Sequence, residues 1–288
     1  METQRLSGRT ISQKIKTSIH DAIVKLPSKP GLAVVTVGDD PASKVYVKNK
    51  EEACREAGIV WKQVSLSEKV SEEELFSVIS RLNTDPEIHG ILVQVPLPPN
   101  LTHIERAIVE AIDPKKDVDA FHPFNVGKFV SCKGSACDNL LLPCTPYGII
   151  RLLEEYAVPI QGSHVVTLGR SNLVGKPTSL LMLARDATVT VCHTKTKDLK
   201  EISKQADILI VAIGKPHSID ATFVKPGAVV VDVGINWSPS GVVGDVDEQS
   251  VNGVVSALTP VPGGVGPMTI AILLENTLKA YHMQTDTS

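Results

Sequence analysis

A tyrosine and a lysine stand four residues apart on a predicted helix that directly follows a short apolar strand. The strand, residues 32–37, runs into a Gly-Asp-Asp-Pro turn. Pro41 suits the first turn of a helix, where its missing N–H is not needed. On that helix Ser43, Tyr46 and Lys50 are spaced by three and four residues, so they share one face.

These side chains bring a hydroxyl, an aromatic ring and an amine to the carboxyl end of a strand, where open α/β sheets bind their ligands. A flat ring can stack on a flat substrate. A lysine beside the ring can transfer protons when burial or a neighbour lowers its pKa. The alternative is an ordinary solvated helix, because Lys44, Lys48 and Lys50 all suit a charged surface. From this segment alone the solvated helix is favoured.

Further polar residues follow later strands. Gln94 lies near the end of the predicted strand 90–95, within reach of the Lys50 helix, and an amide there can orient an amine. Residues 116–119, Lys-Asp-Val-Asp, supply two carboxylates, for which a surface turn is the simpler interpretation. The eight histidines show no metal-ligand spacing, so we predict no metal site.

Length and charge bound the class of protein. A chain of 288 residues suits two modest domains, and 42% hydrophobic residues suffice for real cores. The net charge is −3 and the pI about 6.2, which argues against a nucleic-acid or membrane partner. No apolar run approaches the roughly 18 residues that span a bilayer. The N-terminal residues lack the pattern of a signal peptide.

The five cysteines include no C-x-x-C pair, which favours free thiols in a reducing compartment, here the cytoplasm. Cys132 and Cys137 could pair or bind a metal. Because no second cluster lies nearby in the sequence, we expect neither.

Strands and helices alternate along the chain, which predicts parallel sheets covered by helices. Residues 71–74 predict a capping box at the start of a helix, and residues 113–143 predict a long loop. The first series comprises helices 9–26 and 102–112 and strands 32–37, 59–66 and 90–95. The second comprises helices 145–156 and 268–281 and strands 165–168, 188–191, 208–212, 229–233 and, weakly, 254–257.

The first strand of the second series ends in a glycine-containing turn, residues 169–177, that lacks the G-x-G-x-x-G fingerprint. Glycines at a strand-to-helix turn still let backbone N–H groups approach a phosphate. The second strand ends without a carboxylate, and Arg170 in the turn can hold a phosphate through two hydrogen bonds. NADP is therefore favoured over NAD. The alternative, in which His193 and Lys195 are ordinary surface residues, stays open.

Six motifs in a fixed order cover nearly the whole chain. They are Val37-Gly38-x-x-Pro41-Ala42-Ser43-x-x-Tyr46-x-x-x-Lys50, Gly90-Ile91-Leu92-Val93-Gln94-Val95-Pro96-Leu97-Pro98, Lys116-Asp117-Val118-Asp119, Pro143-Cys144-Thr145-Pro146-x-Gly148, Gly169-Arg170-Ser171-x-x-Val174-Gly175-x-Pro177 and residues 259–269. The set resembles the bifunctional methylenetetrahydrofolate dehydrogenase/methenyltetrahydrofolate cyclohydrolase family. Two positions depart from it: Ala120 replaces a usual glycine, and Thr194 replaces a frequent serine.

The resemblance implies an α/β fold of two domains with a cleft between them for folate and NADP. Residues 1–145 would form a parallel α/β folate domain, onto which the last helix, 268–288, packs. Residues 146–267 would form a Rossmann-like domain. The family also implies a homodimer and a place in one-carbon metabolism that supplies purine biosynthesis.

Residue roles follow from the same resemblance. Lys50 would transfer protons in the cyclohydrolase step, Gln94 would position it, and Ser43 would support the cluster. The residues implied to bind folate are Tyr46, Asp119, Gly263 and Gly264. Those implied to bind NADP are Gly169, Arg170, Ser171, Thr194 and Ile235.

The implied activity oxidises 5,10-methylenetetrahydrofolate with NADP and hydrolyses the methenyl product to 10-formyltetrahydrofolate. One alternative is a monofunctional NAD-linked dehydrogenase, against which Lys50 and the missing acid after Val191 argue. A less favoured alternative is a non-catalytic nucleotide-sensing module, which would not need the Tyr46–Lys50 cluster.

Overall fold

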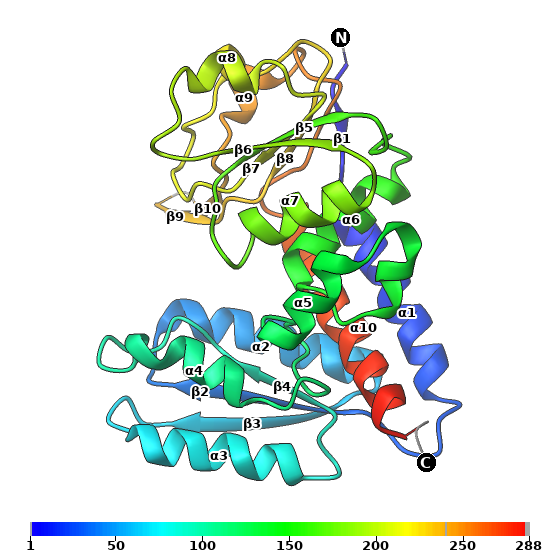
Figure 1. Cartoon of the computed structure of the whole chain (residues 1–288), viewed down its shortest axis with the longest axis vertical. Helices are drawn as coiled ribbons and strands as arrows, with labels where there is room; N and C mark the ends of the chain where they lie inside the picture. Colours follow the sequence, from blue (N-terminus) through cyan, green and yellow to red (C-terminus); the bar gives the residue numbers. More distant parts are fainter. Residues whose placement is uncertain (1, 240, 286–288) are drawn as a thin grey trace. The chain divides into compact units, whose positions relative to one another are not determined.

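The chain divides into two compact units, each built from three segments (Figure 1). The computed structural model describes residues 2–239 and 241–285, and for residues 41–43 it describes the backbone alone. One unit, here the six-stranded unit, comprises Met1–Gln13, Val130–Cys137 and Pro143–Thr269. The other, the three-stranded unit, comprises Lys14–Phe129, Asp138–Leu142 and Ile270–Ser288. The predicted first domain was residues 1–145, but residues 1–13 belong to the six-stranded unit.

The three-stranded unit contains a parallel sheet in the order β3-β2-β4. Its strands are β2 (Gly31–Val37), β3 (Val60–Leu66) and β4 (Gly90–Val93). Its helices include α2 (Pro41–Ala57), α3 (Glu72–Thr84), η1 (Thr102–Ile104) and α4 (Glu105–Ala111). Buried aliphatic side chains such as Val35, Ile79 and Ile91 form the core. As the capping motif predicted, the Ser71 hydroxyl accepts the Glu74 N–H at the start of α3.

The predicted long loop of residues 113–143 is wrong in part. It contains α5 (Pro123–Ser131) and η2 (Gly134–Asn139). Asn125 anchors α5, because its amide donates to the Pro114 carbonyl at 2.9 Å and to the Asp117 carboxylate at 3.0 Å. Phe129 on the same helix is buried. The helix is too short for its apolar pattern to stand out in the sequence.

The six-stranded unit contains a parallel sheet in the order β1-β11-β8-β7-β5-β6. Its strands are β1 (Gln4–Arg5), β5 (His164–Leu168), β6 (Thr188–Cys192), β7 (Ile208–Val211), β8 (Val229–Asp232) and β11 (Ala257–Leu258). The four predicted strands that correspond to β5–β8 are confirmed. The weakly predicted strand 254–257 is wrong except at its last residue, because β11 begins at Ala257. Strand β1 and the antiparallel hairpin of β9 (Asn236–Ser238) and β10 (Gly241–Val243) were not predicted.

In the described part of the chain, five helical elements accompany the six-stranded sheet, and others have residues in both units. The first group is α6 (Cys144–Glu155), α7 (Gly175–Ala184), α8 (Leu199–Ser203), η3 (Ala221–Phe223) and α9 (Glu248–Val251). Helices α1 (Gly8–Ile23) and α10 (Val265–Thr285) have residues in both units, as do α5 and η2. Within the described residues, no helix is both long and apolar enough to cross a bilayer.

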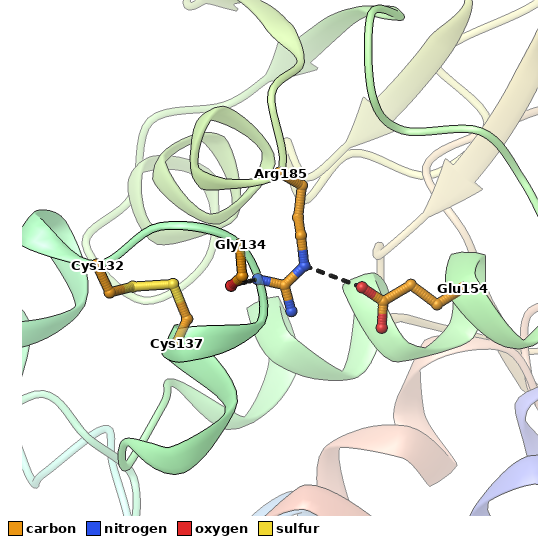
Figure 2. The surroundings of a disulfide bond; sticks show 5 residues. All are labelled: Cys132, Gly134, Cys137, Glu154 and Arg185. Carbon is orange, nitrogen blue, oxygen red and sulfur yellow. Dashed lines mark hydrogen bonds and ion pairs between the residues drawn. A yellow bond between two sulfur atoms is a disulfide. The ribbon is translucent and has the colours of Figure 1, made fainter.

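The expectation that all cysteines are free thiols is wrong for one pair. Cys132 and Cys137 form a disulfide (Figure 2). The ring that it closes contains Gly134, whose φ of 55° helps the chain double back. The Gly134 carbonyl accepts a hydrogen bond from Arg185, and Arg185 also pairs with Glu154 at 2.9 Å. This turn has no signature in the spacing of the two cysteines. Cys54, Cys144 and Cys192 form no disulfide, so the prediction of thiols is confirmed for these three, and all three are buried.

Candidate active site

Lys50 and Gln94 meet at the carboxyl ends of the strands of the three-stranded unit. Lys50 projects from α2, which follows β2, and Gln94 directly follows β4. The Gln94 backbone N–H donates to the Val35 carbonyl at 2.8 Å, and its side-chain amide nitrogen donates to the Val95 carbonyl at 2.9 Å. Its oxygen Oε1 is thereby turned to Lys50 and accepts a hydrogen bond from Nζ at 3.0 Å. The predicted proximity of Gln94 and Lys50 is confirmed.

Tyr46 lies one turn before Lys50 on the same helix and is half-buried. Burial raises the pKa of its phenol, so the ring stays neutral at physiological pH. Cys54, one turn after Lys50, is buried, and burial raises the pKa of its thiol to about 12, so it is not a nucleophile. The side chain of Ser43 lies outside the described residues.

A cavity of 210 Å³ lies at the same end of the sheet. It is lined from α2 by Lys44, Val47, Lys48 and Glu51, and from the loop after β4 by Gln94. Tyr46 and Lys50 do not line it. Gln94 therefore contacts this cavity with one part of its surface and the amine of Lys50 with another.

The turn of residues 116–119 is held from several sides, which excludes a solvated surface turn. Lys116 is buried, and its amine donates to the carbonyls of Leu82 at 3.1 Å and Asp85 at 2.8 Å. The Asp117 carboxylate accepts the His122 N–H at 2.8 Å, and burial raises the pKa of this carboxyl. Asp119, half-buried, is the outermost carboxylate of this fixed turn.

Two further contacts fix the same turn. Asn276 on α10 donates to the Val118 carbonyl at 2.8 Å and to the Leu142 carbonyl at 2.8 Å. The Ile91 N–H of β4 donates to the Lys116 carbonyl at 2.7 Å. The backbone that carries Asp119 is therefore bound both to the sheet and to the last helix.

Ala120 has a φ of 59° and is fully buried. An alanine in this left-handed region carries a steric cost that glycine does not. We expect Ala120→Gly to raise the free energy of unfolding by about 0.5–1 kcal/mol and to leave folate affinity unchanged. Urea unfolding and folate titration test this.

A matched control exists in Ala157, which has a φ of 53° but is exposed and lies in the other unit. Ala157→Gly should stabilise by a similar amount. A weaker folate complex in Ala120→Gly alone would show that the turn depends on the alanine methyl group.

In the six-stranded unit, the turn after β5 has the shape of a phosphate cradle. Gly169 has a φ of 118°, and a Cβ built on it would lie 2.2 Å from the Ala212 carbonyl oxygen, so only glycine fits. The Ser171 hydroxyl oxygen accepts the N–H groups of Val174 at 3.1 Å and Gly175 at 3.3 Å, which folds the chain into the start of α7. Arg170 and Ser171 are exposed at this turn.

Thr194 is exposed in a tight turn at the end of β6. The His193 N–H donates to the Thr196 hydroxyl at 2.9 Å, and the Lys195 N–H donates to His193 Nδ1 at 3.1 Å. Since β6 pairs in parallel with β5, the turn after β5 and the turn after β6 both lie at the carboxyl ends of the strands. A glycine cradle, an exposed arginine and a hydroxyl without a neighbouring carboxylate suit a phosphorylated dinucleotide.

Gly263 and Gly264 lie in a tight turn before α10, which excludes a loose linker. The Gly264 N–H donates to the Pro260 carbonyl at 2.8 Å, and the Gly8 N–H donates to the Gly263 carbonyl at 2.9 Å. Both glycines belong to the six-stranded unit, whereas Tyr46, Lys50, Gln94 and Asp119 belong to the three-stranded unit. Ile235 follows β8, and 45% of its surface is exposed.

Sequence reasoning missed two buried carboxylates in the six-stranded unit, Asp232 and Asp245. Asp232 ends β8, and Asp245 follows β10. The signal for Asp232 was its place at the end of the apolar run 229–233, where an acid is out of pattern. Asp245 lies in a Gly-Asp-Val-Asp segment, a sequence that is typical of an ordinary turn.

Two domain families match the chain. Residues 6–119 match the tetrahydrofolate dehydrogenase/cyclohydrolase catalytic domain, and residues 143–285 match the tetrahydrofolate dehydrogenase/cyclohydrolase NAD(P)-binding domain. The bifunctional protein FolD of Halalkalibacterium halodurans is 52% identical over 283 residues, which cover 97% of this chain and 99% of that protein.

Solved structures agree. The bifunctional FolD methylenetetrahydrofolate dehydrogenase/cyclohydrolase from Campylobacter jejuni superimposes with a TM-score of 0.92 at 46% identity, covering 98% of this chain and 99% of that one. The N5,N10-methylenetetrahydrofolate dehydrogenase-cyclohydrolase of Trypanosoma brucei, solved with NADP cofactor and inhibitor, gives 0.91 at 34% identity and 98% coverage of both chains.

Proposed function

The chain belongs to the tetrahydrofolate dehydrogenase/cyclohydrolase family, and we propose how its residues divide the work of that family's two reactions. The protein is a bifunctional enzyme: it oxidises 5,10-methylenetetrahydrofolate with NADP and hydrolyses the methenyl product to 10-formyltetrahydrofolate. The observation that carries the division is the hydrogen bond between Lys50 and Gln94.

Folate binding falls to the residues of the three-stranded unit. The ring of Tyr46 stacks on the flat pterin-aminobenzoate system. The Asp119 carboxylate accepts N–H groups from the amino-pyrimidine edge of the pterin, and its turn is fixed before the substrate arrives. Ser43 supports the Tyr46–Lys50 cluster.

Hydrolysis falls to Lys50. Water attacks the methenyl carbon, the ring opens, and protons must move away from the water and onto the departing nitrogen. Gln94 accepts one of the N–H donors of the Lys50 amine. This hydrogen bond sets the direction in which the remaining N–H groups point. Gln94 thus positions the amine that transfers the protons.

Oxidation needs mainly orientation, because the folate nitrogens stabilise the cation left behind. When bound, NADP supplies the hydride acceptor. Gly169 lets the turn after β5 pack against the Ala212 carbonyl and so shapes the turn that receives its phosphates. Arg170, Ser171 and Thr194 provide donors at the ends of β5 and β6. Ile235 offers an apolar surface after β8.

Arg170→Ala should weaken NADP binding far more than NAD binding. Losing a charge-assisted contact to the extra phosphate costs roughly 1.5–3 kcal/mol, or about 10- to 150-fold in affinity. Calorimetric titration of both cofactors measures the effect. Lys176→Ala is a matched control, because the Lys176 amine is engaged with Asn172 at 2.8 Å. Equal losses for NADP and NAD would show that Arg170 does not bind the phosphate.

One assay tests the whole function. The enzyme is mixed with methylenetetrahydrofolate and either NADP or NAD, and methenyl absorbance is followed as it rises and decays. We expect a rise with NADP and an enzyme-dependent decay. Methenyl accumulation without catalysed decay would indicate a monofunctional dehydrogenase, and no turnover a nucleotide-sensing module.

We also propose a homodimer in the cytoplasm. Strand β3 pairs with β2 at one edge of its sheet, and Val60 on it is 49% exposed, which suits pairing with another chain. The bacterial relatives support the location, whereas the Cys132–Cys137 disulfide argues against a reducing compartment. Light scattering of the purified enzyme tests the dimer, and fractionation of the source cells tests the location.

A further inference from the structure

The order of strands in the six-stranded unit creates a switch point between β5 and β7. From β5 the chain moves outward to β6, and then returns past β5 to β7 and β8. Ligands of open α/β sheets bind at the carboxyl ends of the strands at such a point. The loop after β7, which begins at Ala212, lies against the Gly169 turn after β5. The loops after β7 and β8 are thus candidates for contact with the cofactor.

One carboxylate holds both of these loops. Asp245 is fully buried. Its Oδ2 accepts the N–H groups of Ile213 at 2.7 Å and Gly214 at 2.9 Å. Its Oδ1 accepts the Lys215 N–H at 2.9 Å and the side-chain amide of Asn236 at 2.9 Å. Three successive backbone donors after β7 and one side chain after β8 therefore converge on a single group.

A second buried carboxylate holds Asp245 in turn. Asp232 accepts the N–H groups of Gly234 at 2.9 Å, Asp245 at 3.0 Å and Val246 at 2.9 Å. Burial raises the pKa of Asp232 to about 6, and its three N–H donors oppose that rise. The segment around Ile235 is thus held on both sides: Asp232 accepts the Gly234 N–H, and Asp245 accepts the side-chain amide of Asn236.

The glycines of this segment show how closely the parts pack. A Cβ built on Gly234 would lie 2.4 Å from the Asp245 carboxylate, and one built on Gly244 would lie 1.9 Å from the Asp232 carboxylate. The two acids therefore occupy spaces that are open only because residues 234 and 244 have no side chain.

We propose that Asp245 is a positioning residue for the cofactor, which fixes the loops of residues 213–215 and 234–236 in the form that receives the part common to NADP and NAD. The inference rests on the proposed function. It differs from the role of Arg170 and Thr194, because the loops after β7 and β8 lie on the other side of β5 from the end of β6. Asp245 should therefore affect both cofactors alike.

The test compares Asp245→Asn with Asp247→Asn. Asp247 lies two residues further on, and its carboxylate caps α9 by accepting the Ser250 N–H at 3.2 Å, a role that asparagine also fills. An asparagine at 245 would instead turn an NH2 group toward backbone donors. We expect Asp245→Asn to weaken NADP and NAD by the same factor, roughly 10- to 100-fold. Asp247→Asn should bind both cofactors as wild type does.

A readout without cofactor separates positioning from contact. Hydrogen exchange of the amides of 213–215 should be slow in the wild-type protein and fast in Asp245→Asn. If Asp245→Asn fails to fold, Asn236→Ala tests the inference instead. It removes one of the four hydrogen bonds to Asp245, and the Asn236 side chain is partly exposed. It should weaken both cofactors by a smaller, equal factor of about three.

Three results would overturn the inference: unchanged cofactor affinity in a folded Asp245→Asn, unchanged affinity in Asn236→Ala when Asp245→Asn does not fold, or a loss confined to NADP. A wild-type protein that binds neither cofactor would instead remove the proposed function itself, and this inference with it.

Discussion

We expect Lys50→Met to abolish methenyl hydrolysis and to leave much of the hydride transfer. A positioned proton-transfer group contributes roughly 10²- to 10⁴-fold to a rate, and we expect a loss of that size in the cyclohydrolase step. Hydride transfer needs no side-chain base, so the dehydrogenase rate should change far less. Methionine keeps most of the length and the apolar stem of lysine, so helix α2 should be retained. Decay of added methenyltetrahydrofolate and reduction of NADP measure the two steps separately.

The matched control is Arg55→Met, five residues later on the same helix. Its side chain is exposed and does not line the cavity beside Gln94. This variant removes the same charge from α2 away from Gln94, so both rates should remain. Wild-type hydrolysis in Lys50→Met would end the assignment of Lys50.

Asp119→Asn should depress both activities together, because both reactions use one folate pose. A carboxylate accepts two N–H groups from the pterin, whereas an amide presents a donor to one of them. Each charge-assisted hydrogen bond is worth roughly 1.5–3 kcal/mol, so we expect at least a tenfold loss of folate affinity and of both rates. Folate titration, together with the two rate assays, measures it.

Asp117→Asn is the control for this change. Asp117 is buried, and its carboxylate accepts from His122 and Asn125 within the turn. Its loss should lower the free energy of unfolding by about 1–3 kcal/mol and reduce folate affinity less than Asp119→Asn does. Normal folate binding and normal rates in Asp119→Asn would remove Asp119 from the site.

The sequence predicted those parts of the fold whose signal is local. Strands such as β5 and β7 are short apolar runs, and Ser71 caps α3 through a residue only three positions away. Strand β1 was missed because two residues carry no periodicity; they form a strand only by pairing with β11, about 250 residues later. The disulfide was missed for a similar reason, since a turn, and not spacing, brings its cysteines together.

The family and its bifunctional activity were predicted and are confirmed. In the site, the Lys50–Gln94 contact was predicted because each residue follows a strand, and β2 and β4 are neighbours. Asp245 could not be found in this way. Its partners, residues 213–215, lie about thirty positions earlier, and no periodic pattern links an acid to backbone N–H groups at that distance. The individual residue roles stay predictions until the variants are measured.

The hydrogen bond from Asn276 to the turn that carries Asp119 has a consequence for synthesis on the ribosome. The Asn276 amide that holds the backbone of this turn at Val118 lies 158 residues later in the sequence. A nascent chain stalled anywhere in between carries the folate turn without this support. This part of the substrate site can therefore be completed only after Asn276 has been translated, and a truncated product that lacks α10 would contain every proposed catalytic residue but not the finished turn.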